Sequence, residues 1–209
     1  TAKPSAAASL RNISARAYAG GDKNQLISGF IIAGKDPKPI VLRASGPSLS
    51  AFGLSDVLAD PMIELYDSTG ALIASNDNWS DSQASLFAVG GTYDLLRPDN
   101  DLEPALAIEL PPGSYTAILH GKNGGRGLAL TEVYDVSVGD ASQLVNISTR
   151  ALVAPGDNVL IGGFVASGQN GVGVILRALG PSLLSSGLAP ILSDPSLATF
   201  DEKCPLVRF

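Results

Sequence analysis

Side chains that carry oxygen gather in two short segments of the sequence. They are Asn76, Asp77, Asn78 and Asp81 in the first segment, and Asp99, Asn100, Asp101 and Glu103 in the second. A calcium ion takes several oxygen ligands from carboxylates, amides and backbone carbonyls, so both segments are candidate calcium ligands. Asp and Asn suit turns equally well, because their side chains replace backbone hydrogen bonds there. Neither segment has the spacing of an EF-hand loop, and both interpretations stay open.

Charged residues that recur along the chain form a second group. They are Arg16, Arg43 and Asp60, which are matched at a constant distance by Arg150, Arg177 and Asp194. A guanidinium group suits an ion pair with a carboxylate or several hydrogen bonds to loop carbonyls. Because the same residues occur twice in one chain, we expect a structural role for them, as an ion pair or as an arginine that holds a loop.

Residues for nucleophilic catalysis are few. His120 is the only histidine, so a Ser-His-Asp relay would have to include it. Ser48 and Ser182 lie in Gly-Pro-Ser-Leu elements that lack the Gly-x-Ser-x-Gly pattern, and we expect them to start helical turns. The catalytic alternative is a calcium-dependent hydrolase of a small ester or lactone. In that mechanism the cation acts as a Lewis acid, and His120 or a carboxylate such as Asp77 acts as the general base.

The composition disfavours several kinds of partner. The formal net charge is −6 and the 14 Lys and Arg residues are scattered, so we expect no nucleic-acid surface. No apolar run approaches the roughly 20 residues that cross a bilayer, so we expect no transmembrane segment. The single cysteine, Cys204, excludes an internal disulfide and a zinc site built on several thiolates.

The sequence repeats itself without a gap. Asn12 begins an Asn-Ile-Ser-x-Arg-Ala element that returns at Asn146, at an offset of 146 − 12 = 134 positions. Between residues 10–67 and 144–201, 25 of the 58 aligned pairs are identical. We therefore predict an internal duplication with one full unit and about half of a second.

The duplication divides the chain into four parts. They are a linker or mature N-terminus from which any export signal has been removed (1–9), a full unit (10–143), a partial second unit (144–201) and a divergent tail (202–209). Strands cut from a sandwich leave an apolar face and open edges. We therefore expect the partial unit to pack on the first unit or on another chain.

Short apolar segments bounded by Gly, Pro and Asp predict strands, and the 23 glycines and 14 prolines favour many turns. We expect strands at 25–32 and 40–44, with copies at 159–165 and 172–178. The segments 62–66 and 71–74 predict a hairpin, as do 114–120 and 128–135 around a glycine-rich loop. A further hairpin loop is expected at 33–39, and helical turns at 47–52 and 80–88. Strands at such spacing predict an all-β fold, a β-sandwich of jelly-roll-like type.

Three sequence elements carry a resemblance to a known family. They are Glu64-Leu65-Tyr66-Asp67 with Gly70, Ala74-Ser75-Asn76-Asp77-Asn78-Trp79, and Leu110-Pro111-Pro112-Gly113-Ser114-Tyr115-Thr116. This third of the chain resembles the bacterial pre-peptidase C-terminal domain, a jelly-roll-like sandwich attached to secreted enzymes and surface proteins. The Asn-Ile-Ser-x-Arg-Ala and Arg-Ala-x-Gly-Pro-Ser-Leu elements resemble a tandem repeat of large exported proteins from environmental bacteria.

These resemblances imply a secreted or cell-surface protein with an accessory or adhesive role. Together with the residues above, they predict a non-catalytic extracellular module for binding, adhesion or assembly, stabilised by calcium. Its partner would be an extracellular ligand or another chain, including a second copy in a homo-oligomer. The calcium-dependent hydrolase is the alternative.

Overall fold

The computed structural model describes residues 8–21, 24–88, 90–137, 141–169, 171–201 and 206–207, and confirms the all-β class. The strands are β1 (Ser9–Ala19), β2 (Leu26–Ala33), β3 (Lys38–Ser45), β4 (Pro61–Tyr66), β5 (Leu72–Asn76), β6 (Ala105–Leu110), β7 (Gly113–Gly121), β8 (Gly127–Asp135), β9 (Gln143–Arg150), β10 (Ile161–Ser167), β11 (Thr199–Phe200) and β12 (Leu206–Val207). The helices are short: η1 (Pro47–Phe52), α1 (Trp79–Ser82), α2 (Ala84–Phe87), α3 (Thr92–Leu95), η2 (Lys122–Gly124), η3 (Gly156–Asn158) and η4 (Pro181–Ser186).

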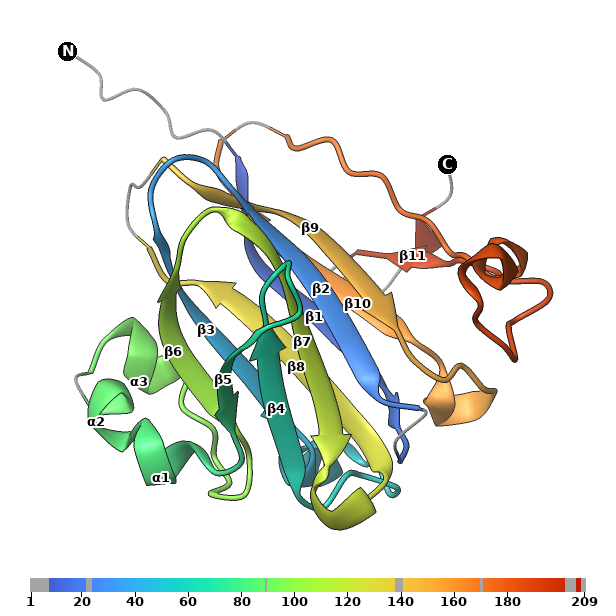
Figure 1. The fold of residues 1–209 in the computed structure, drawn as a ribbon, viewed down its shortest axis with the longest axis horizontal. Helices are drawn as coiled ribbons and strands as arrows, with labels where there is room; N and C mark the ends of the chain where they lie inside the picture. Colours follow the sequence, from blue (N-terminus) through green and yellow to red (C-terminus); the bar gives the residue numbers. More distant parts are fainter. Residues whose placement is uncertain are drawn as a thin grey trace. The chain divides into compact units, whose positions relative to one another are not determined.

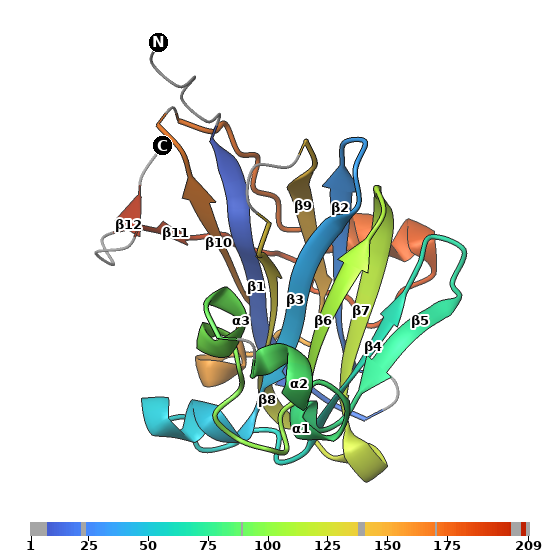
Figure 2. The same ribbon diagram turned by 90° about the vertical axis from the view of Figure 1, so that its left-hand side faces the viewer.

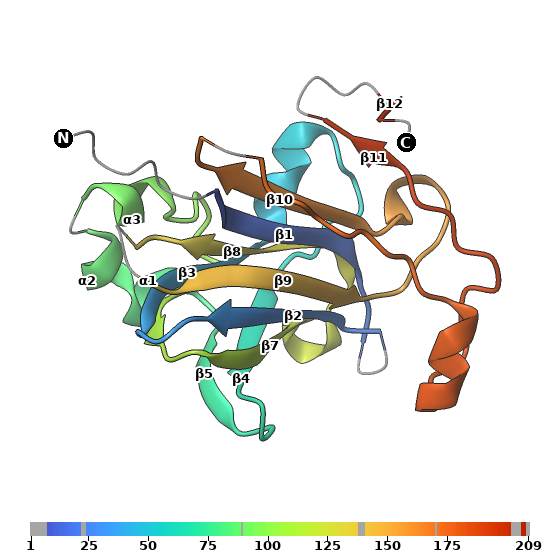
Figure 3. The ribbon, with the colours of Figure 1, turned by 90° about the horizontal axis from the view of Figure 1, so that it is seen from above.

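Ten antiparallel strands form one sheet that folds into the two layers of a sandwich (Figures 1 and 3). One layer has the order β5-β4-β7-β2-β9, and the other has the order β10-β1-β8-β3-β6. The ladders meet at a single residue pair, Leu10 with Leu144. Three short helices, α1 to α3, lie beside the end of the sandwich that carries β6 (Figure 2). The main core therefore lies between layers that are each built from strands distant in sequence.

Alternation along the strands explains which face is buried. In β1, Ile13, Ala15 and Ala17 are buried while their neighbours are half-buried, and in β2 Leu26 and Phe30 follow the same period of two. These residues join one apolar core cluster. The small alanines of β1 let the facing layer approach closely, whereas the ring of Phe30 fills the space between layers and stacks on Tyr115 with centroids 5.4 Å apart.

One of the three expected hairpins is confirmed, and two are wrong. Strands β4 and β5 pair directly, and Gly70 takes the positive φ of 82° that their turn requires. By contrast, β2 pairs with β7 and β9, while β3 pairs with β6 and β8. Strands β7 and β8 are likewise neighbours in sequence but lie in different layers. Both connections cross between layers, which the period-two pattern does not reveal because it identifies buried faces and not partners.

The expected strand at 172–178 is wrong, since the structure shows irregular, exposed chain there. Its counterpart β3 is bonded on one edge by β6 and on the other by β8. Among the described residues, 172–178 pairs with no strand. A strand in isolation gains no ladder hydrogen bonds and buries no face, so the same residue pattern stays irregular. Strands β1, β6, β9, β11 and β12 were not expected from the sequence.

The described residues of 172–209 form a second compact unit. Within it, η4 has the same local shape as η1. Gly46 and Gly180 precede the two turns with φ of −131° and −138°, and both turns end at a left-handed glycine. The unit also holds the short antiparallel pair β11 and β12. The expected turns at 47–52 and 80–88 correspond to η1 and to α1 and α2.

The described helices are all too short, or too polar, to cross a bilayer. The expected linker at 1–9 lies outside the described residues as far as residue 7. Most of the expected tail at 202–209, with Cys204, also lies outside them.

Candidate functional site

The first group of expected calcium ligands lies between β5 and α1. Asn76 is buried and serves the fold, because its amide oxygen accepts a hydrogen bond from the Ala105 backbone at 2.9 Å. Asp77 forms an ion pair with Lys122, and Asn78 donates to Asp81 at 3.0 Å. The hydrogen bond to Asp77 raises the pKa of Lys122. These groups therefore form a compact anionic loop that faces one ammonium group.

Three oxygen atoms in this region are buried and accept no hydrogen bond. They are Oδ1 of Asp60, Oδ1 of Asp77 and Oδ1 of Asn78. Asp60 belongs to the region because its backbone carbonyl accepts a hydrogen bond from the Lys122 amide at 2.9 Å, and its negative charge adds to the raised pKa of Lys122. Carboxylate and amide oxygens are the kinds of ligand that a hard cation takes.

The second group of expected ligands takes a different place. Glu103 is fully buried and accepts hydrogen bonds from the backbone amides of Gly46 and Ser48, both at 2.9 Å. Its other oxygen accepts from the Ser48 hydroxyl at 2.8 Å. Asp99 and Asp101 are exposed. Both oxygens of Glu103 thus hold the first turn of η1, and this carboxylate does not join the Asp77 region.

A pocket of about 270 Å³ lies next to this turn. Its polar lining includes Arg43, Ser48, Asp99, Glu103 and Glu132. Arg43 donates to Glu132 at 2.7 Å and to the carbonyl of Leu96 at 3.1 Å. Because the carboxylates of Glu103 and Glu132 both accept hydrogen bonds within the fold, they hold the wall of the pocket.

Tyr134 completes the group around Arg43. Its hydroxyl donates to Glu132 at 2.6 Å and accepts from Arg43 at 3.1 Å, while the Arg43 guanidinium lies 5.1 Å from the centre of the Tyr134 ring. Burial, followed by the hydrogen bond to Glu132, raises the pKa of Tyr134 to about 12. Burial opposes the charge on Arg43, but its contacts with Glu132 and Tyr134 outweigh burial and raise its pKa.

Alkaline titration tests this group. We expect Tyr134 to lose its proton only near pH 12, above the ordinary value of 10.0. A raised folded-state pKa means that the contribution of Tyr134 to stability is complete below pH 10 and is lost as the pH rises toward 12. In a titration followed by phenolate absorbance, Tyr134→Phe should remove one proton from the highest-pH phase. Loss of a proton from the phase near pH 10 instead would contradict the assignment.

The recurring charged residues occupy unequal surroundings. Arg43 forms its ion pair with Glu132, while Asp60 lies near Lys122. The Nε of Arg16 is buried without a hydrogen-bond partner. Their counterparts, Arg150, Arg177 and Asp194, are all exposed. The residues that hold Arg43, namely Glu132, Tyr134 and Leu96, fall in the part of the unit that the second copy does not repeat.

The two residues named for the hydrolase have separate contacts. His120 lies on β7, with its Nε2 3.6 Å from a carboxylate oxygen of Glu64. The same oxygen accepts a hydrogen bond from Tyr66 at 3.0 Å. Asp77 instead contacts Lys122. His120 and Asp77 therefore form no hydrogen bond or ion pair with each other, and each contacts a different neighbour.

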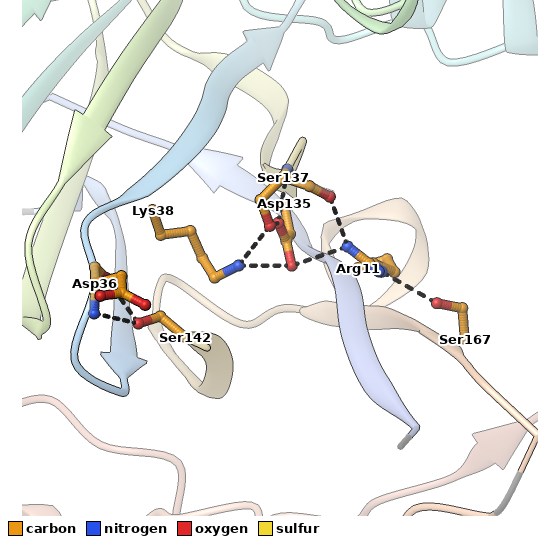
Figure 4. A network of polar contacts seen from close by, with 7 residues as sticks. All are labelled: Arg11, Asp36, Lys38, Asp135, Ser137, Ser142 and Ser167. Atoms are coloured by element: carbon orange, nitrogen blue, oxygen red, sulfur yellow. Dashed lines mark hydrogen bonds and ion pairs between the residues drawn. The ribbon is translucent and has the colours of Figure 1, made fainter. Parts of the chain in front are cut away.

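A buried polar network was missed by sequence reasoning (Figure 4). The ammonium group of Lys38, with no exposed side-chain surface, lies 3.0 Å from Asp135 and donates to Ser137 at 2.8 Å. Arg11 donates to the same carboxylate oxygen of Asp135 at 3.3 Å and to Ser167 at 3.2 Å. The network joins β1, β3, β8 and β10. Its only signal in the sequence is a lysine at the start of an apolar strand, and the partner is distant in sequence.

Within the described ranges, no three His, Cys, Asp or Glu side chains are grouped so as to hold a metal ion. Comparison of the chain with models of protein families, with curated proteins and with solved structures finds no match.

Proposed function

We propose that this chain is a non-catalytic, extracellular module for binding and assembly, secreted or displayed on a cell surface. The observation that carries the proposal is that the strands of the second copy pair with strands of the first. Strand β9 extends the layer that ends in β2, and β10 extends the layer that ends in β1. Pairing of strands across units is a general means of joining protein modules, because backbone hydrogen bonds supply affinity and alternate side chains supply specificity.

The polar clusters support the same reading. Glu103, Arg43 and Asp135 each form hydrogen bonds or ion pairs with backbone or side-chain groups of other strands and turns. Groups held in this way fix the sandwich and its surface in one arrangement. The resemblance to accessory sandwich domains and to exported tandem repeats adds the extracellular location to the proposal.

The function is tested with the purified full chain. The proposal expects no turnover of a panel of small esters and lactones, with calcium or with EDTA, and expects binding or assembly in sedimentation or surface-attachment assays. Turnover that follows the protein through purification and is lost on EDTA treatment and in Asp77→Asn would contradict it in favour of the hydrolase.

Calcium is part of the proposal as a stabilising ion. The loop between β5 and α1 would supply Asp77 and Asn78, with Asp60 from the segment before β4. Support comes from the three buried oxygen atoms that lack hydrogen bonds there. A bound calcium ion would replace Lys122 as the cation that faces Asp77, and would tie this loop to the start of β4.

Calcium removal gives a direct prediction. Any ion that binds only the folded state raises its stability, by about 2.7 kcal/mol at a free concentration one hundred times Kd. We expect calcium to raise the midpoint of thermal unfolding and EDTA to reverse the rise. Asp77→Asn should abolish this response, whereas Asp101→Asn, at an exposed position of the second acidic segment, should leave it intact. An equal response from the Asp77→Asn variant would contradict this site.

A further inference from the structure

Strands β9 and β10 hold the places in the repeat that β1 and β2 hold in the first unit, and the two sets pair reciprocally. Ile13 of β1 lies opposite Phe164 of β10, and Phe30 of β2 lies opposite Ile147 of β9. Phe164 is the repeat counterpart of Phe30, and Ile147 is that of Ile13. The register is the same along both ladders. The first strand of each set therefore pairs with the second strand of the other set: β1 pairs with β10, and β9 pairs with β2.

Close contacts follow the same reciprocity. A Cβ atom added to Gly29 would lie 2.6 Å from the hydroxyl oxygen of Ser148, and one added to Gly163 would lie 2.7 Å from that of Ser14. Leu10 and Leu144, which are counterparts of each other, form the pair where the two layers meet. The four strands β1, β2, β9 and β10 are thus related by an approximate two-fold symmetry that exchanges the layers.

The symmetry breaks at the outer edges. Besides pairing with a strand of the second set, β1 pairs with β8, and β2 pairs with β7. Within the described part of the chain, β10 pairs only with β1, and β9 meets β1 on its second edge only at Leu144. Backbone groups on these edges are therefore left without ladder partners, one edge in each layer.

Several apolar side chains beside the open edges are more exposed than their counterparts in the first unit. Phe30 is 1% exposed because Tyr115 of β7 stacks on it, whereas its counterpart Phe164 is 40% exposed. Val145 on β9 and Val165 on β10 are also about half exposed, at 48% and 54%. An open edge beside exposed apolar side chains is a site for strand addition.

We propose that the open edges of β9 and β10 are the acceptor for a β7–β8 segment of another repeat unit. The repeat identifies this occupant. A β8-type strand would bond β9 in the register of β8 on β1, and a β7-type strand would bond β10 in the register of β7 on β2. In the second register the residue equivalent to Tyr115 lies opposite Phe164, as Tyr115 lies opposite Phe30. The β7–β8 segment of a folded copy is already paired on both edges, so the donor is a unit whose own β1 and β2 are not engaged.

This inference deepens the proposed role in assembly and rests on it. The probe is a synthetic peptide of residues 113–136, labelled and titrated into the full chain. We expect saturable binding, with slower amide exchange confined to β9 and β10. A peptide that carries Tyr115→Ala changes only the donor, and should bind at least about tenfold more weakly.

Two protein variants complete the test. Phe164→Asp should abolish binding, while Phe52→Asp, at a position on η1 that is 82% exposed, should leave it unchanged. Absence of saturable binding, equal binding by the Tyr115→Ala peptide, or protection at other strands would each overturn the inference. Self-association of the full chain that buries β9 and β10 and excludes the peptide would also overturn it. A turnover assay on the same preparation tests the proposed function separately, so the two failures are distinguishable.

Discussion

Phe30→Ala is expected to lower the free energy of unfolding by about 3–5 kcal/mol, the usual range for a buried phenylalanine cut to alanine. Phe30 is 1% exposed, belongs to the main core and stacks on Tyr115. The change removes the ring, leaves a cavity between the two layers, and costs both the transfer of the ring and the lost contacts of its neighbours. Chemical denaturation followed by circular dichroism measures the loss.

The repeat offers a matched control for this change. Phe164→Ala removes the same side chain at the corresponding position, but this ring is 40% exposed and, among the strands that the structure describes, β10 pairs only with β1. We expect a loss of only about 1 kcal/mol, because much of the ring already contacts water. Equal losses at the two positions would mean that the surroundings of β2 and β10 are alike, which contradicts an open edge on β10.

Asp135→Ala should have an effect of similar size for an electrostatic reason. The carboxylate is 3% exposed and lies 3.0 Å from the fully buried ammonium group of Lys38. Removing one partner of a buried pair leaves the other charge without compensation, which costs about 3–5 kcal/mol. Arg11 loses the same partner. The free energy of unfolding from urea titration is the measurement.

Two further variants test whether the uncompensated charge of Lys38 causes this loss of stability. Asp157→Ala changes an exposed aspartate of η3 and is expected to shift stability by less than about 0.5 kcal/mol. Lys38→Met combined with Asp135→Leu removes both charges, and should recover much of the loss, since well-packed apolar residues can replace a buried pair. A double variant as unstable as Asp135→Ala alone would show that the uncompensated charge is not the cause.

Much of the fold is predictable from local patterns. Short apolar segments bounded by Gly, Pro and Asp locate β2, β3, β4, β5, β7, β8 and β10, and in β7 apolar residues at every second position add to the prediction. The failures concern partners. Residues 33–39 and the glycine-rich loop after β7 resemble hairpin loops, yet each carries the chain into the other layer. Local sequence does not specify which strand supplies the ladder bonds.

The segment at 172–178 shows the same limit most clearly. It shares Leu176, Arg177 and Ala178 with Leu42, Arg43 and Ala44 of β3, and yet only β3 is a strand. The difference lies in the neighbours β6 and β8, which flank β3. Strand structure is therefore a property of the assembled sheet as much as of the segment.

For the candidate site residues too, groupings of residues close in sequence were predictable, whereas contacts between distant residues were not. The grouping of Asn76, Asn78 and Asp81 follows from their closeness in sequence. The role of Glu103 at the first turn of η1 and the pairing of Lys38 with Asp135 depend on contacts between residues distant in sequence. Sequence reasoning identified the oxygen-rich loop but not the cation, Lys122, that faces it.

Residue-resolved amide exchange of the free chain tests the reciprocal pairing most directly. In an antiparallel pair, alternate residues direct their amides to opposite neighbours. We predict slow exchange at nearly every amide in the middle of β2, which is bonded by β7 and β9. In β9, slow exchange should occur only at alternate amides, those directed to β2, with fast exchange at the amides between them. Uniform slow exchange along β9, or fast exchange throughout it, would contradict the account.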